Sequence, residues 1–185
     1  MREGRTPVRP LSLNEIGGRF LSPILPLYDK LMKTKIALAM GANLGDDPAE
    51  NIRWGALKLL EAGVEELLMA PIIRTKPVDC VPGTPDFLNT AVIGLWGGKP
   101  LELLAACQRI EREAGRPAVH SSHEARLLDI DVLLWGAETL SLPGLIVPHP
   151  RMHLRRFVLE PLAAIAPDWI VPPFGKTVGQ LLQEV

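Results

Sequence analysis

Apolar and polar residues alternate along the chain with periods that divide its middle part into strands and helices. Residues 36–40 form a continuous apolar run, which is typical of a buried strand. Asp47 and Pro48 follow a glycine-containing turn and predict the start of a helix that ends before Gly63. The apolar residues of this helix recur at helical spacing and are Ile52, Ala56, Leu59, Leu60 and Ala62.

The same alternation continues to residue 135. Residues 64–75 and 87–96 have the pattern of two strands, separated by a loop rich in proline and glycine. Pro100 opens a second helix, a polar loop spans residues 116–125, and a further strand follows. This order is the split β-α-β pattern of ferredoxin-like folds. We therefore expect an α+β sandwich, with a mostly antiparallel sheet, helices on one face and a C-terminal helical extension.

The two ends of the chain differ from this middle part. Residues 1–31 carry arginines and prolines without a clear period, so we expect an irregular N-terminal extension. Met32 lies shortly before the first predicted strand, separated from it by residues 33–35, and is a candidate for the true start of translation. The folded domain is then residues 32–185, and we expect short helices near residues 161–165 and 178–182.

Composition and charge narrow the class of protein. The chain has 185 residues, 47% of them hydrophobic, which is enough for one domain with a full core. A formal net charge of -1 argues against a general nucleic-acid binder, so any phosphate site must be local. The two cysteines and the lack of a long apolar segment favour a cytoplasmic protein without disulfides or membrane spans. We expect a monomer or a weak homo-oligomer whose substrates are small molecules.

Two acidic residues, Asp129 and Asp131, interrupt the apolar run at residues 127–134. In a strand they would share one face, with their Cα atoms roughly 6.6 Å apart at about 3.3 Å per residue. Asp is rare in strands and costs stability there unless something binds it. Because carboxylate oxygens are preferred ligands of Mg²⁺, this spacing predicts a metal site rather than a solvated strand face.

Arg116 and Arg126 bracket the polar loop that precedes the acidic pair. A guanidinium group matches phosphate oxygens in geometry and keeps its charge at all physiological pH values. A single loop arginine would carry little information. Two of them beside a candidate Mg²⁺ site favour phosphate binding and the stabilisation of charge on a transferred phosphoryl group.

Five short blocks of sequence follow one another along the chain. They are residues 41–45 (GANLG), 85–89 (PDFLN), 111–116 (EREAGR), 126–131 (RLLDID) and 147–153 (VPHPRMH). Together they resemble the 6-hydroxymethyl-7,8-dihydropterin pyrophosphokinases, and the similarity extends from Lys35 to the C-terminus. The resemblance implies a folate-pathway enzyme that moves the β,γ-pyrophosphoryl group of ATP onto the hydroxymethyl oxygen of the pterin and releases AMP.

The resemblance also implies roles for individual residues. Asp129 and Asp131 correspond to the ligands of two Mg²⁺ ions that bridge the ATP phosphates, and together with Arg116 and Arg126 they are the expected catalytic residues. The residues expected on the ATP side are Gln108, Glu111, Arg116, Arg126, His149 and Arg155. The residues expected on the pterin side are Thr75, Pro77, Val78, Asn89, His123 and Phe157.

The loop at residues 117–125 departs from the family pattern. It lacks most of the basic residues that the family carries there. His123 stands at the position of an aromatic residue, where it could stack on the pterin, and Glu124 places a negative charge near the phosphates. This departure leaves the affinity for ATP, the turnover and the closure of the loop open.

Several alternatives follow from the residues themselves. Phe157 is an ordinary core aromatic in one of them, and Asn89 caps a turn in another. His149 and His153 have a spacing that suits a metal site on a helix, although Pro150 disfavours a continuous helix between them. At the level of function, the alternatives are a metal-dependent phosphohydrolase and a non-catalytic module that binds pterin or nucleotide.

Overall fold

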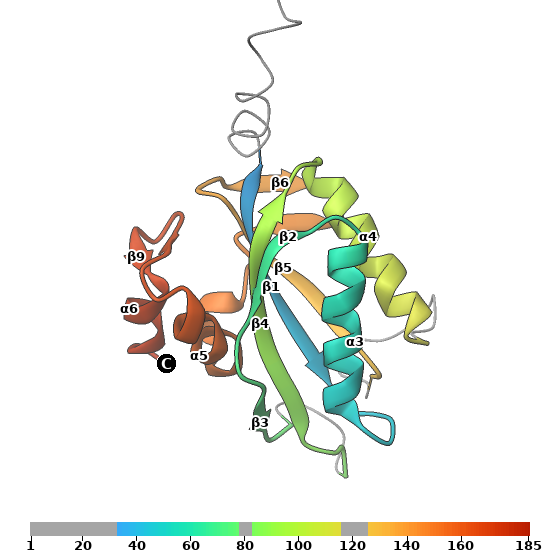
Figure 1. Cartoon of the computed structure of the whole chain (residues 1–185). Coiled ribbons are helices and arrows are strands. Elements are labelled where there is room, and N and C mark those ends of the chain that lie inside the picture. Colours follow the sequence, from blue (N-terminus) through green and yellow to red (C-terminus); the bar gives the residue numbers. More distant parts are fainter. Residues whose placement is uncertain (1–32, 78–82, 116–125) are drawn as a thin grey trace, which may run out of the picture. The chain divides into compact units, whose positions relative to one another are not determined.

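The computed structural model describes residues 33–77, 83–115 and 126–185. The chain divides into two units, Met1–Lys33 and Thr34–Val185, and the second contains all the elements below (Figure 1). The predicted extension at residues 1–31 lies outside the described residues.

A five-stranded antiparallel sheet forms the centre of this unit. Strand β1 (Thr34–Ala42) pairs with β4 (Phe87–Trp96) on one side and with β5 (Asp129–Trp135) on the other. Both β2 (Glu65–Met69) and β3 (Ile73–Thr75) pair with β4. The predicted strands at residues 36–40 and 87–96 are therefore confirmed, and β1 is longer than its apolar run.

The prediction of one continuous strand over residues 64–75 is wrong, because the segment forms β2 and β3 with a break between them. Pro71 lies in the break and has no N–H group to donate to the sheet. The carbonyl of Ala70 accepts a hydrogen bond from the Thr90 hydroxyl at 2.8 Å. Glu66 has a φ of 49°, and the register shifts between Glu65 and Leu68, so β2 itself is irregular.

Two long helices cover one face of the sheet, as predicted. They are α3 (Pro48–Glu61) and α4 (Pro100–Glu113). The Asp47 side chain accepts hydrogen bonds from the N–H groups of Ala49 and Glu50, so it is the N-cap of α3. The core beneath the helices contains buried residues from both layers: Leu38, Met40, Ile52, Leu59, Leu103, Ile110, Ile130 and Val132.

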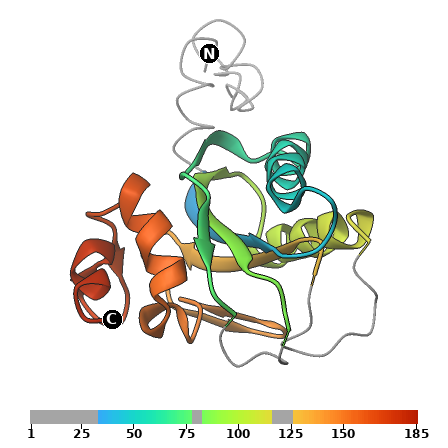
Figure 2. The same cartoon turned by 90° about the horizontal axis from the view of Figure 1, so that it is seen from below.

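The expectation that helices cover only one face is wrong. Helix α5 (Arg156–Ile165) and α6 (Val178–Leu182) belong to a second core on the opposite face, and Figure 2 shows them across the sheet from α3 and α4. Ala37 and Ala91 face this core, and such small side chains let a helix approach the strands closely. Helix α5 starts at Arg156, before the predicted residues 161–165. Pro161 therefore lies inside the helix and not in the first turn, where proline is favoured.

Shorter elements complete the unit. A 3-10 helix at Met152–Leu154 precedes α5. Two hairpins, which the sequence pattern did not predict, are β6 (Leu140–Leu142) with β7 (Leu145–Val147), and β8 (Ile170–Val171) with β9 (Lys176–Thr177). Within the described ranges, no helix has the length and apolar character needed to cross a membrane.

Candidate active site

Three neighbouring strands align a row of residues across the sheet. Gly41 of β1 lies opposite Asn89 of β4 and opposite Asp129 of β5. Two residues away along β1 and β5, Ala39 lies opposite Asp131. Residues directly opposite each other project from the same face, so Asn89 and the acidic pair share a face. With strands about 4.8 Å apart, the Cα atoms of Asn89 and Asp129 are roughly 10 Å apart, with only glycine between them.

The acidic pair projects away from α3 and α4. Ile130 and Val132 are buried in the core beneath those helices, and alternation along β5 turns Asp129 and Asp131 to the other face, on the side of α5. Both aspartates are partly exposed, unlike their apolar neighbours. The carboxylates are thus accessible on a common face, as the spacing of two predicts.

Arg126 is the closest cationic partner of the pair. Its Nη1 atom lies 2.6 Å from Oδ2 of Asp129, and the two side chains are 20% and 22% exposed. Charge-assisted contacts between a guanidinium and a carboxylate are typically this short. The structure therefore brings the predicted phosphate-binding arginine and the predicted metal ligand into direct contact.

His149 faces the second carboxylate. Its Nε2 atom lies 4.0 Å from Oδ2 of Asp131, which is too far for a hydrogen bond. Its Nδ1 atom accepts the Arg151 N–H at 3.2 Å, so the neutral ring carries its proton on Nε2, toward Asp131. The backbone N–H of His149 donates to the Leu133 carbonyl at 2.9 Å and ties this turn to β5.

Burial dominates the electrostatics of this pair. It raises the pKa of Asp131, and the neighbouring Asp129 raises it further, against the opposing effects of His149, Arg155 and Arg126. Burial also lowers the pKa of His149, although Asp131 opposes this shift. A neutral imidazole therefore faces a carboxylate whose charge is only partly compensated, and an added cation at the pair would be favourable.

Two of the predicted pterin-side residues, Thr75 and Asn89, lie together at the other end of the row. The Asn89 side-chain amide donates from Nδ2 to the Thr75 hydroxyl at 2.8 Å. Asn89 is 9% exposed and lies inside β4, so the interpretation as a turn cap is wrong. Phe157 lies in the first turn of α5, is half-buried and packs against the second core, and the Arg155 guanidinium carbon lies 5.6 Å from its ring centre. Pro77, two residues beyond Thr75, is also half-buried.

Two predicted ATP-side residues, Gln108 and Glu111, lie on α4, on the opposite face of the sheet from the acidic pair, and Glu111 contacts β5. The Glu111 carboxylate is 6% exposed and accepts the Ile130 N–H at 2.8 Å. Gln108 is exposed on the same helix. Glu111 thus holds the backbone between Asp129 and Asp131. Val78, Arg116 and His123 lie outside the residues that the structure describes.

Two residues near the site were not predicted from the sequence. Asn43 is buried next to Arg126, and Arg151 donates its backbone N–H to His149. The charge of Arg151 lowers the pKa of both His149 and Arg155, after the larger effect of burial. The run of basic residues at 149–156 was the signal for Arg151, and the block at residues 41–45 was the signal for Asn43, although it does not indicate which residues Asn43 contacts.

The residues present suit Mg²⁺ that is also held by a substrate. Over the described ranges, no group of three or more His, Cys, Asp and Glu side chains could hold a metal ion. The ring of His153, which with His149 formed the alternative metal site, packs against the ring of Phe174, with ring centres 4.6 Å apart. Mg²⁺ is commonly bound by one or two carboxylates together with phosphate oxygens and water. The Asp129 and Asp131 pair fits that arrangement.

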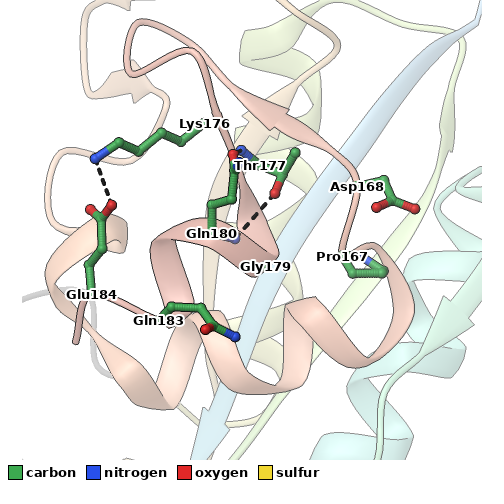
Figure 3. A pocket seen from close by; sticks show the side chains of 8 residues that line it. All are labelled: Pro167, Asp168, Lys176, Thr177, Gly179, Gln180, Gln183 and Glu184. Carbon is green, nitrogen blue, oxygen red and sulfur yellow. Dashed lines mark hydrogen bonds and ion pairs between the residues drawn. The ribbon is translucent and has the colours of Figure 1, made fainter.

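A separate surface pocket lies between the end of α5 and α6 (Figure 3). Its lining includes Asp168, Thr177 and Gln180, and Lys176 is paired with Glu184 at 2.6 Å. None of the predicted site residues lines it. The pocket is therefore distinct from the row across the sheet.

Comparisons with known proteins agree on one family. The family model described as 7,8-dihydro-6-hydroxymethylpterin-pyrophosphokinase matches residues 37–167. A protein of Synechocystis named 2-amino-4-hydroxy-6-hydroxymethyldihydropteridine pyrophosphokinase is 36% identical over 166 residues, covering 89% of this chain and 83% of that protein. A Pseudomonas aeruginosa protein of the same name is 39% identical over 153 residues, covering 82% of this chain and 91% of that protein.

Solved structures give the same fold. The wild-type HPPK-DHPS of Plasmodium falciparum with pteroate has a TM-score of 0.64 at 14% identity and is matched over 82% of this chain. The chain spans only 42% of that structure, so the similarity concerns one part of it. Together with the family model and the relatives, this agreement shows that the chain belongs to the 7,8-dihydro-6-hydroxymethylpterin-pyrophosphokinase family.

Proposed function

We propose that the chain transfers the β,γ-pyrophosphoryl group of ATP to 6-hydroxymethyl-7,8-dihydropterin. The hydroxymethyl oxygen attacks the β-phosphorus, and the bond from this phosphorus to the oxygen that bridges to the α-phosphorus breaks. AMP leaves with that oxygen, the hydroxyl proton passes to solvent, and the pterin diphosphate remains. Membership of the pyrophosphokinase family supports this reaction.

The observation that carries the assignment to particular residues is the row from Asn89 through Gly41 to Asp129. A ring bound at Asn89 and a polyphosphate bound at the acidic pair would meet above Gly41, where no side chain separates them. Such an arrangement holds the two reactants in one orientation, which is the main source of catalysis in phosphoryl transfer.

On the phosphate side, Asp129 and Asp131 hold Mg²⁺, in our proposal two ions. Bound there, Mg²⁺ would neutralise phosphate charge in the transition state. Arg126, whose Nη1 lies 2.6 Å from Oδ2 of Asp129, would bind a phosphate oxygen as well. Arg116 and Arg155 complete the cationic side of the site, and the neutral His149 would donate a hydrogen bond from Nε2 there. Glu111 is a positioning residue, since its carboxylate holds the Ile130 N–H.

On the pterin side, Asn89 provides hydrogen bonds and Phe157 stacks on the ring. The bond from Nδ2 of Asn89 to the Thr75 hydroxyl fixes the orientation of the amide. Its Oδ1 atom is then directed over Gly41, because a Cβ added at Gly41 would lie 3.0 Å from it. The oxygen can accept from a ring N–H and the second amide hydrogen can be donated. Pro77, Val78 and His123 border the ring in this proposal.

We also infer that the domain is of the ferredoxin-like type. Strand order β2-β4-β1-β5, with every pairing antiparallel and α3 and α4 on one face, supports this classification. The second layer formed by α5 and α6 is then an addition to that fold, and it provides Phe157 on the pterin side.

AMP release with and without the pterin tests the reaction. Purified protein is incubated with MgATP, and nucleotides are separated by chromatography. We expect pterin-dependent AMP from the wild type, and a loss of roughly 100-fold or more in kcat for Asp129→Asn and Asp131→Asn. Asp168→Asn is the matched control, since Asp168 is exposed on the separate pocket and should keep full activity.

Other products would contradict the proposal in defined ways. Phosphate release from ATP without pterin would indicate a phosphohydrolase. Binding of both ligands without any AMP would indicate a non-catalytic module. Full activity of both aspartate variants would leave the reaction in place and remove the acidic pair from it.

A further inference from the structure

Lys76 and Asp86 form an ion pair just outside the two strands that carry Thr75 and Asn89. Lys76 directly follows Thr75, the last residue of β3, and Asp86 directly precedes Phe87, the first residue of β4. Nζ of Lys76 lies 3.2 Å from both carboxylate oxygens of Asp86. Thr75 and Phe87 are the outermost Cα partners of the two strands, so the ion pair lies at the open end of this ladder.

Strand β3 is a short element at the margin of the sheet. It consists of Ile73–Thr75, and β4 is its single partner among the strands that the structure describes. None of its three residues is fully buried. Short segments with few buried contacts open locally at a low cost in free energy. A contact that closes the end of so short a ladder therefore changes how often the ladder is intact.

The position of β3 determines the orientation of a proposed pterin ligand. The Thr75 hydroxyl accepts the hydrogen bond from Nδ2 of Asn89 at 2.8 Å. Asn89 lies inside β4, opposite Ile73, so this bond requires β3 to stay in register with β4. If Thr75 moves away, the Asn89 amide loses the partner that fixes it. Its oxygen and its second amide hydrogen are then no longer presented in one orientation.

We propose that the ion pair of Lys76 and Asp86 is a clamp that keeps β3 in register with β4 and so orients Asn89 for the pterin. Lys76 is a positioning residue, since it acts through Thr75. The Lys76 side chain is 86% exposed and that of Asp86 is 24% exposed, so salt screens the attraction between them. The contribution of the clamp to pterin affinity therefore falls as ionic strength rises. This inference rests on the proposed function for the identity of the ligand.

Pterin titrations at two salt concentrations measure the effect of the clamp. The full chain is saturated with the α,β-methylene analogue of MgATP, in which the bond that breaks in the reaction is replaced, and the Kd of the hydroxymethyl pterin is measured by calorimetry. At low salt, we expect Lys76→Ala to raise this Kd by about 3–5-fold, the upper part of the range for an exposed ion pair. At about 1 M NaCl, where the screening length is roughly 3 Å, the two proteins should agree within about 1.5-fold. The Kd of the analogue should be the same in both.

Further variants separate the ion pair from the lysine itself. Lys76→Arg keeps the charge and should keep the wild-type Kd. Lys76→Asp places two acids together and should raise the Kd more than Lys76→Ala, whereas adding Asp86→Lys to it should return the Kd to within about twofold of wild type. Arg74→Ala is the matched control, because Arg74 is an exposed cation on β3 with no ion pair among the described residues. It should leave the Kd unchanged.

Two readouts test whether Lys76 acts through Thr75. In the Thr75→Val background, where the hydroxyl is absent, Lys76→Ala should raise the pterin Kd by less than about 1.5-fold. In the protein without ligands, Lys76→Ala should speed hydrogen exchange of the protected amides of β3 by about 3–5-fold and leave β1 unchanged. A merely structural role for Lys76 would lower the thermal stability or speed exchange across the whole sheet, without a selective effect on the pterin.

Equal pterin Kd values for the wild type and Lys76→Ala at low salt would overturn the inference. So would a difference that persists in full at high salt or in the Thr75→Val background. The AMP assay separates these results from failure of the proposed function. A wild type that forms pterin-dependent AMP while Lys76→Ala binds the pterin normally contradicts the clamp alone. Pterin binding that depends on the clamp without any AMP contradicts the reaction alone, and a wild type that does not bind the pterin contradicts both.

Discussion

Gly41→Ala is expected to weaken pterin binding selectively. Gly41 lies between Asn89 and Asp129 in the row across the sheet, and its φ is not in the left-handed region, so alanine fits the backbone. The new Cβ would lie 3.0 Å from Oδ1 of Asn89, which is about 0.4 Å closer than the 3.4 Å at which ordinary contacts begin. The Asn89 amide must therefore move, although its Nδ2 is held by Thr75 at 2.8 Å.

The size of the effect follows from the hydrogen bonds that this movement weakens. Displacement of the amide affects its bond to Thr75 and its bonds to the pterin, each with a net value of about 0.5–1.5 kcal/mol. A combined loss of about 1–2 kcal/mol corresponds to a rise in the pterin KM of roughly 5–30-fold. The KM for ATP should change by less than about twofold, because the added methyl group contacts Asn89 and not the acidic pair.

A double-mutant cycle decides whether the effect passes through Asn89. AMP release is measured for Gly41→Ala, Asn89→Ala and the double variant at varied pterin concentration. In the Asn89→Ala background, the Gly41→Ala change should raise the pterin KM no further, since the atom with which it collides is gone. The reasoning is refuted if Gly41→Ala costs the same in both backgrounds, or if it raises the KM for ATP instead.

Two further predictions concern stability. Glu111→Ala should lower the free energy of unfolding by about 1–3 kcal/mol, since it leaves the buried Ile130 N–H without its acceptor, and Glu111→Gln should recover part of this loss in urea titrations. Burial raises the pKa of the Cys107 thiol from 9.0 to about 12, so the folded state keeps the proton while the unfolded state releases it. Unfolding free energy should therefore fall between pH 9 and 12, by up to about 1.4 kcal/mol per pH unit from this group, and the slope should be shallower in Cys107→Ala. Equal slopes in the two proteins would contradict the assignment to Cys107.

Local patterns were sufficient for the elements that carry the site. The apolar run broken by Asp129 and Asp131 predicted both the strand and the common face of the two carboxylates, since alternation is a property of any strand. The start of α3 at Asp47 and Pro48 and the bounds of β4 were also predicted from local signals.

The C-terminal helices were predicted, but their packing on the opposite face of the sheet was not, for a physical reason. A continuous apolar strand such as residues 36–40 indicates that both faces are buried but does not say what covers each face. Pro161 resembled a helix start, because proline is favoured there, and so the first turns of α5 were missed. Asn43 has its partners at Arg126 and Pro85, and long-range contacts of this kind leave no periodic signal in the sequence.

The most direct test of the central claim is the position of the metal in a crystal grown with Mn²⁺ and the α,β-methylene analogue of ATP, located by its anomalous scattering. We expect Mn²⁺ on the face of the sheet that carries Asn89, within roughly 2.0–2.2 Å of carboxylate oxygens of Asp129 and Asp131 and of the phosphates. Metal and phosphates bound elsewhere, with both carboxylates free of them, would contradict the account.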